Sequence, residues 1–277
     1  MPSALGDAAA LGHGHGLPDV ASLDLAVQHA SLPDVFAILA SWSTAAETPD
    51  YTGPVPPGFT TSALLSALSI NRPDIVSLLL SVEPDGLPIK EAIAAGHSAN
   101  FQAFLWHGWD VNGSVERDGP SALGYAVKNE TLVTWLLQRG ADPNAGYKYD
   151  TPLSRAALTG SIDVLNTMLS HGGDVQRGQV LHWAVERQSD CCEVVTILLR
   201  RGASPNQMEF DGVFPIWSVL QILGTPLHKA VALGKAEVVA RMLEYGADPE
   251  KKDTAGKTAR AMAIELGRDD ILSLIVQ

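Results

Sequence analysis

The stretch that decides the fold is TPLHKAVALGKAEVVARMLEYGADPEKKDTAGKTARAMA, residues 225–263. TPLHKA predicts the start of a first helix, because Pro226 needs no amide partner in the first helical turn. A second helix follows, with apolar residues at helical spacing: Val238, Val239, Met242 and Leu243. Gly246 then ends this helix, since it has no Cβ to oppose a left-handed conformation. DTAGKT supplies the turn before the next helix.

Weaker copies of this pattern precede and follow it, each with an alanine near the middle of its first helix. The alanines are Ala26, Ala67, Ala92, Ala126, Ala156, Ala184, Ala230 and Ala263. Successive steps are 41, 25, 34, 30, 28, 46 and 33 residues. The copies, from TPLH at the start to GADP at the end, resemble the ankyrin repeat family, whose period is about 33 residues. The resemblance implies an all-α solenoid of about eight helix pairs with short turn hairpins.

One helix pair cannot bury its own apolar face, so the pairs are expected to stack on one another. The predicted organisation is a mobile N-terminal tail, residues 1–19, followed by one repeat domain, residues 20–277. Steps between register alanines that differ strongly from about 33 residues mark segments that depart from the repeat pattern. The 46-residue step contains an apolar insertion, residues 207–223.

Composition and charge exclude several classes of function. With 46% hydrophobic and 18% charged residues, the chain is typical of a folded protein. The formal charge of −12 disfavours nucleic acid and anionic membrane surfaces. No apolar run reaches the ~20 residues of a membrane helix, and no secretory signal is evident. The adjacent Cys191 and Cys192 show no metal-binding spacing, which indicates structural thiols, a reducing cytoplasmic location and no metal site.

The insertion, QMEFDGVFPIWSVLQIL, has ten apolar residues among seventeen. Asp211 and Gly212 predict a turn, and Pro215 can open a short helix. Burying ten such side chains contributes on the order of 10 kcal/mol before entropy, so the segment must lie on the protein, a partner or a ligand. Two alternatives stay open. It pads the array, or it covers the groove as a lid with Phe210, Phe214 and Trp217 in the wall.

The resemblance also implies where ligands bind: the turn tips and the exposed face of each first helix, on the concave side. His182 and His228 fall at the histidine of the TPLH-like motif, which the family uses to tie neighbouring turns. Aromatic residues concentrate in the central repeats, and the groove positions are less polar than a solvated face. The predicted ligand- or partner-binding residues are Tyr125, Lys128, Asn129, Tyr147, Tyr149, Asp150, Leu158, Trp183, Glu186, Arg187, Phe210, Phe214, Trp217 and Leu233.

Two functions compete. The first, from the resemblance, is a binding module whose concave groove recognises a protein partner with apolar side chains and some basic character. The second is a cofactor-free enzyme or binder that holds an apolar small molecule under the insertion, for cyclisation, dehydration or isomerisation. The sequence contains no HExxH, GxSxG, phosphate-binding loop or dinucleotide fingerprint, so no catalytic residue and no cofactor is assigned.

Overall fold

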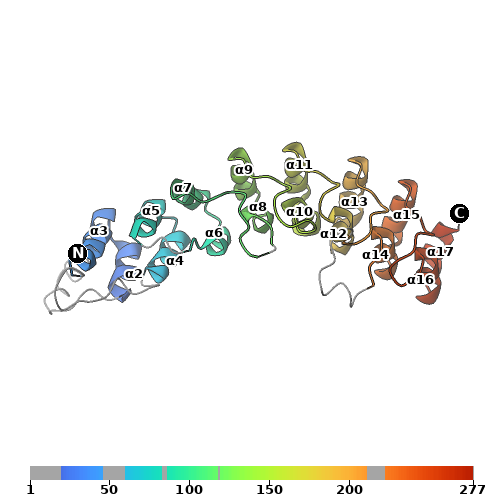
Figure 1. Ribbon diagram of the computed structural model, residues 1–277, viewed down its shortest axis with the longest axis horizontal. Helices are drawn as coiled ribbons and strands as arrows, with labels where there is room; N and C mark the ends of the chain where they lie inside the picture. The colour runs from blue at the N-terminus through green and yellow to red at the C-terminus, as the bar shows by residue number, and fades with distance from the viewer. Residues whose placement is uncertain (1–19, 46–59, 83–85, 118, 211–221, 277) are drawn as a thin grey trace, which may run out of the picture. The chain divides into compact units, whose positions relative to one another are not determined.

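The computed structural model describes residues 20–45, 60–82, 86–117, 119–210 and 222–276 (Figure 1). The chain forms two compact units, residues 1–110 and residues 111–277. The predicted tail 1–19 and the middle of the insertion, residues 211–221, lie outside the described residues.

Unit 1 contains three helix pairs within its described residues. They are α2 (Val20–His29) with α3 (Leu32–Ala45), α4 (Thr61–Ser69) with α5 (Pro73–Val82), and α6 (Ile89–Ala95) with α7 (Ser98–Trp106). Unit 2 contains five. They are α8 (Ala122–Tyr125) with α9 (Glu130–Gln138), α10 (Pro152–Thr159) with α11 (Ile162–Ser170), α12 (Val180–Glu186) with α13 (Cys191–Arg200), α14 (Pro226–Ala232) with α15 (Ala236–Glu244), and α16 (Ala259–Glu265) with α17 (Asp269–Ile275). The prediction of an all-α array of about eight helix pairs is confirmed.

The first helices of each unit lie side by side, as do most second helices (Figure 1). The register alanines make this close approach possible, because a methyl group leaves room for the next helix. Seven of the eight are at most 1% exposed, and only Ala26 is half-buried. The second helices bury stripes of larger residues, such as Val194, Val195, Leu198 and Leu199 in α13.

Turn chemistry sets the ends of the helices. Pro226 occupies the first turn of α14, as predicted, and Pro152 does the same in α10, each behind a capping residue, Thr225 and Thr151. Gly246 follows α15 with a φ of 81°, which a residue with a side chain rarely adopts. Strand pairing in the described residues is limited to three isolated antiparallel bridges: Ser114 with Ser121, Tyr147 with Asp150, and Lys252 with Thr258.

The predicted structural role of the two histidines is confirmed. His228 Nδ1 accepts hydrogen bonds from the Thr225 amide at 3.2 Å and the Thr225 hydroxyl at 2.9 Å, and its Nε2 donates to the Lys257 carbonyl at 3.2 Å. His182 Nε2 donates to the Gly224 carbonyl at 3.3 Å. Both side chains are buried. Each ring therefore ties its own helix to the turn before the next one.

Asparagine side chains join successive turns of unit 2 in a second, repeated way. Asn144 donates to the Gly172 carbonyl at 2.8 Å and accepts from the Asp174 amide at 2.7 Å. Asn112 makes the same pair of contacts one repeat earlier along the chain, and Asn206 makes it two repeats later. These bridges hold the turns, and the surface they carry, in register.

Asn144→Ala is expected to lower the free energy of unfolding by about 1–3 kcal/mol, because two hydrogen bonds are lost and each contributes roughly 0.5–1.5 kcal/mol. Urea unfolding of the purified variant measures the loss. Asn166→Ala, at an exposed position on α11, is the control and should change stability little. Equal stabilities for the two variants would contradict the bridging role.

Candidate functional site

Three aromatic side chains meet on the turn side of unit 2, and we call Tyr147, Tyr149 and Phe210 the aromatic row. The rings of Tyr147 and Tyr149 meet edge to face with centroids 4.9 Å apart, and Tyr149 meets Phe210 with the same separation. Tyr147 is 37% exposed. The structure thus brings together three of the predicted contact residues, which come from two turns about sixty residues apart.

A bidentate ion pair supports the turn that carries the two tyrosines. Arg155 Nε and Nη2 donate to the two carboxylate oxygens of Asp150, each at 2.8 Å. The guanidinium also lies 4.4 Å from the ring centroid of Tyr125, whose hydroxyl donates to Glu116 at 2.7 Å. Hydrogen bonding to Asp150 raises the pKa of Arg155 above its usual value. Asp150 and Tyr125 are therefore engaged within the protein, where they position the turn.

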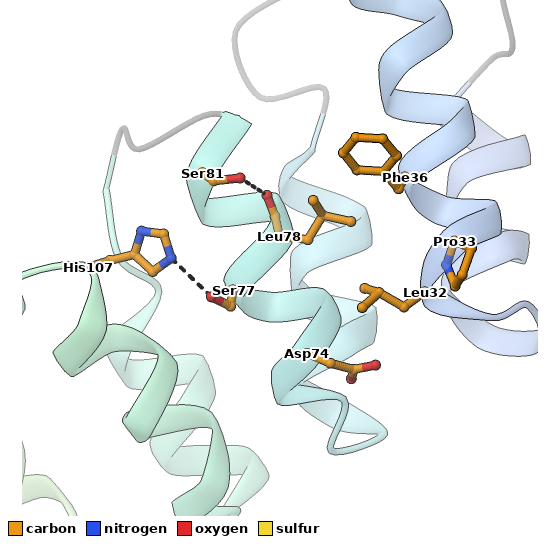
Figure 2. Close-up of a pocket in the computed structure, with 8 residues that line it drawn as sticks. All are labelled: Leu32, Pro33, Phe36, Asp74, Ser77, Leu78, Ser81 and His107. Carbon is orange, nitrogen blue, oxygen red and sulfur yellow. Dashed lines mark hydrogen bonds between the residues drawn. The ribbon is translucent and has the colours of Figure 1, made fainter.

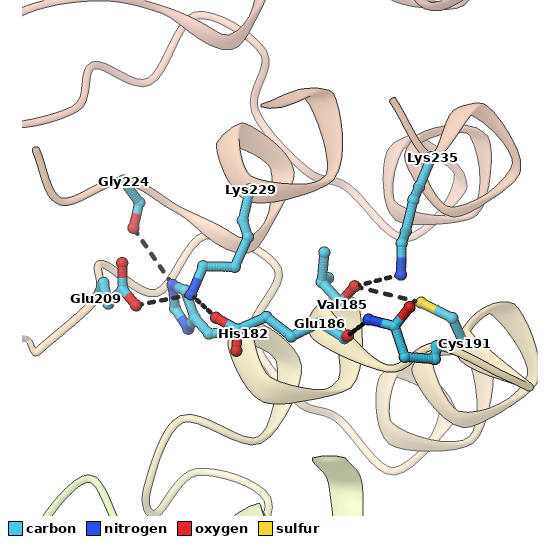
Figure 3. Close-up of polar contacts among 9 residues, drawn as sticks. His182, Val185, Glu186, Cys191, Glu209, Gly224, Lys229 and Lys235 are labelled. Atoms are coloured by element: carbon cyan, nitrogen blue, oxygen red, sulfur yellow. Dashed lines mark hydrogen bonds and ion pairs between the residues drawn. The ribbon is translucent and has the colours of Figure 1, made fainter. Parts of the chain in front are cut away.

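Lys229 of α14 links the array to the start of the insertion (Figure 3). Its ammonium lies 2.5 Å from Glu186 of α12 and 2.8 Å from Glu209 of the insertion. Burial disfavours the charged ammonium, but the hydrogen bonds to Glu186 and Glu209 outweigh it, so the pKa of Lys229 is raised. Lys229 is thus held as a charged link. Such an ammonium is unsuited to act as an amine nucleophile.

Both described ends of the insertion are fixed to the array. The Glu209 amide donates to the Gly224 carbonyl at 2.9 Å, closing the base of the loop. Leu223 is buried and exchanges hydrogen bonds with Thr254, at 2.8 and 2.9 Å. Phe210 has a φ of 54°, a conformation that is rare for a bulky residue and needs support from its surroundings. Contact with Tyr149 provides such support, so the insertion begins in a defined direction.

Phe214 and Trp217 lie outside the described residues, so the padding and lid hypotheses for the insertion both stay predictions. The described part of the insertion does reach the predicted groove, as the lid hypothesis requires. Glu209 reaches Lys229 and, through it, Glu186 on the predicted groove. The alternative function, an enzyme or binder for an apolar small molecule, gains no support from the described residues.

The remaining predicted site residues differ in exposure. Lys128, Glu186 and Leu233 are exposed, whereas Leu158 and Trp183 are half-buried. Asn129 is engaged locally, because its side chain caps α9 by accepting from the Leu132 amide at 3.0 Å. These positions remain candidates for contact with a partner.

Arg187 does not face the groove as an exposed charge, which corrects the expectation from its position. The residue is only 6% exposed. Its Nη1 donates to the carbonyls of Ala156 and Ala157, and its Nε donates to the Ser189 carbonyl. The physical reason is that the carbonyls of the last turn of α10 carry the partial negative charge of the helix C-terminus, which attracts a cation. Lys235 satisfies the end of α12 in the same way, donating to the Val185 carbonyl (Figure 3) and to the Arg187 carbonyl.

Sequence reasoning missed Lys229, Glu209 and Lys235. The two thiols that it did single out are free in the structure. Burial raises the pKa of both Cys191 and Cys192, which makes them poor nucleophiles at neutral pH.

Within the described ranges, no three His, Cys, Asp or Glu side chains are placed to hold a metal ion. No helix there has the length and apolar character needed to cross a bilayer.

Comparison with known proteins places these features in a family. The family model for ankyrin repeats (three copies) matches residues 89–179, 123–209 and 181–277, which together make up more than half of the chain. The chain belongs to the ankyrin repeat family. Its ankyrin repeats are 28% identical to mouse Ankyrin repeat and SOCS box protein 5 over 123 residues, 44% of this chain and 37% of that protein. They are 28% identical to human Rabankyrin-5 over 220 residues, 73% of this chain and 16% of that protein.

Solved ankyrin repeat domains share the fold. The human ASB11 ankyrin repeat domain matches with a TM-score of 0.56 and 22% identity, covering 77% of this chain and 96% of that one. An ankyrin repeat domain from Acinetobacter baumannii matches with a TM-score of 0.54 and 26% identity, covering 68% and 96%. The chain spans little more than a third of the first curated relatives that it matches.

Proposed function

We propose that this ankyrin repeat chain is a binding module that recognises another protein through the aromatic row and the neighbouring first-helix groove of unit 2. The family supports the class of function, since ankyrin repeats typically bind proteins. The braced aromatic row, with Tyr147 exposed and Tyr149 and Phe210 half-buried, is the observation that carries the choice of surface. Tyrosine is enriched among the residues that dominate protein interfaces, because it offers a large contact area at small entropic cost.

The construction of the turn supports this surface. The ion pair between Asp150 and Arg155 holds the turn that carries the two tyrosines. The hydrogen bonds made by Asn112 and Asn144 join this turn to the neighbouring turns. A surface that is already ordered loses little entropy when a partner binds. Leu233, at a predicted groove position, is exposed and offers apolar area. The carboxylates of Glu186 and Glu209 together exceed the charge of Lys229 between them. The partner that fits offers apolar side chains with some basic character.

The proposal includes two further expectations. Residues 20–277 act together as the repeat domain, with the insertion 207–223 contributing its first residues to the binding surface. The free thiols Cys191 and Cys192 support a reducing, cytoplasmic location. The net charge of −12 supports a protein partner over nucleic acid.

Tyr147→Ser is expected to weaken binding of a peptide partner about tenfold or more, since tyrosines at such centres each contribute over ~1 kcal/mol. The peptide would be selected from a displayed random library against the immobilised chain, and its affinity measured by calorimetry. Tyr245→Ser is the matched control, because Tyr245 is also 37% exposed but lies at the end of α15. If both variants bind the peptide alike, the aromatic row is not the binding surface.

A further inference from the structure

Unit 1 carries a groove on its second helices, away from the first-helix face (Figure 2). It has a volume of about 620 Å³ and lies between α3 and α5, with one contribution from the residue after α7. Its lining is Leu32, Pro33, Phe36, Asp74, Ser77, Leu78, Ser81 and His107. Ser77 and His107 are hydrogen-bonded to each other at 3.2 Å along one wall.

The two helices present large apolar side chains to this groove. Phe36 is 59% exposed and Leu32 is 37% exposed. Figure 2 shows both pointing from α3 toward Leu78 on α5, so the three side chains surround the same space. A groove with an apolar lining between two helices is the kind of surface that binds the apolar face of a peptide helix.

Charge identifies the kind of peptide. Residues 1–110 contain eleven Asp and Glu residues but only two Lys and Arg residues, Arg72 and Lys90. Most of the chain's net charge of −12 therefore resides in this part. Residues 111–277 hold the other twenty acids against seventeen bases.

Two of these acids lie where the groove helices begin. Asp74 lines the groove, and Asp34 lies in the first turn of α3. The Arg72 guanidinium lowers the pKa of Asp74, and hydrogen bonds from Ser31 lower the pKa of Asp34. Both carboxylates are thus ionised at neutral pH at the end of the groove where α3 and α5 start. Asp74 is paired with Arg72 at 3.0 Å, so within the described residues Asp34 is the one of these two carboxylates without a cationic partner.

We propose that this groove is a second docking surface, which takes a basic amphipathic helix of another protein. The apolar face of that helix fills the space around Phe36, Leu32 and Leu78, and its Lys or Arg side chains lie near Asp34 and Asp74. Opposite charges speed the encounter and exclude acidic competitors. The surface is separate from the aromatic row, so it does not depend on the function proposed for unit 2.

The probe is a fluorescent 14-residue peptide of leucine and lysine with helical amphipathic spacing, and its anisotropy is followed as the full chain is added. We expect binding that is weakened at least tenfold by Phe36→Ser and by Leu32→Ser. Leu65→Ser is the matched control, because Leu65 is also 37% exposed but lies on α4, outside the groove. It should change the affinity less than twofold, as should Tyr147→Ser. The same peptide with glutamate in place of lysine should not bind.

Three results would overturn the proposal. One is no binding of the leucine–lysine peptide to the wild-type chain. Another is that Phe36→Ser and Leu32→Ser change the affinity no more than Leu65→Ser does, which would show that the peptide binds acidic residues without using the groove. The third is a wild-type dimer in light scattering that Phe36→Ser converts to monomer, which would make the groove a contact between copies. Thermal melting of each variant verifies that it is folded.

Discussion

Phe101→Ala is expected to lower the free energy of unfolding by about 3–5 kcal/mol, the usual loss when a buried aromatic residue is truncated. Phe101 is fully buried on α7, with its ring centroid 5.6 Å from those of both Phe104 and Trp109. Phe104 and Trp109 also meet, at 6.3 Å, so the three rings form one cluster at the end of unit 1. Alanine would leave a cavity inside that cluster. Denaturant unfolding monitored by tryptophan fluorescence measures the change.

Trp106→Ala is the control for this experiment. Trp106 lies on the same helix but is 73% exposed, so its removal should change stability by no more than about 0.5 kcal/mol. Similar losses for the two variants would show that the described burial of Phe101 is incorrect.

Acidification from pH 7 to pH 5 is expected to destabilise the wild-type chain by about 2 kcal/mol more than the His182→Gln variant. Burial, with a smaller contribution from the charge of Lys229, lowers the pKa of His182 from 6.5 to about 3. The imidazole therefore stays neutral in the folded state but takes up a proton in the unfolded state below pH 6.5. Since the unfolded state binds more protons, stability falls as the pH drops through this range, and the loss levels off near pH 3.

Glutamine is chosen because its amide can still donate toward the Gly224 carbonyl, while it cannot titrate. Urea unfolding at a series of pH values gives both curves. His171→Gln, which removes an exposed histidine at the end of α11, should leave the pH dependence like that of the wild type. If the wild type and His182→Gln lose stability in parallel, His182 is not buried in the neutral form.

The fold could be predicted from the sequence because its signals are local and repeated. Each signal determines the structure of only a few neighbouring residues. The signals are an alanine in the first helix, a proline where that helix starts and a glycine after the second helix. Ala67 through Ala263 are buried at their expected places, and Pro152 and Pro226 start α10 and α14. The irregular steps also identified the insertion, and the described ends of that segment leave the array between α13 and α14.

The site could be predicted only in part, because its contacts join distant residues. Tyr147 and Tyr149 could be proposed as contact residues from the sequence, but their contact with Phe210 required the fold. Arg187 occupies a groove position in the repeat, yet its long side chain turns inward to the carbonyls of the preceding first helix. Nothing in the local sequence shows whether the Arg187 side chain points into the groove or toward these carbonyls.

Lys229 was missed for a related reason. Its partners, Glu186 and Glu209, are 43 and 20 residues away, so no spacing pattern marks them as a cluster. The unit 1 groove was missed because helical periodicity does not separate core residues from exposed ones such as Phe36. The total charge of −12 also conceals how unevenly the acids are distributed.

The most direct test of the central claim, that the aromatic row of unit 2 binds a protein, is site-specific crosslinking. A photoreactive phenylalanine replaces Tyr147 in one sample and Tyr245 in another, and each chain is irradiated inside cells. We predict that position 147 forms a discrete crosslink to another protein, identified by mass spectrometry, and that position 245 does not. Crosslinks of equal yield to the same proteins at both positions, or crosslinks to small molecules alone at position 147, would contradict the claim.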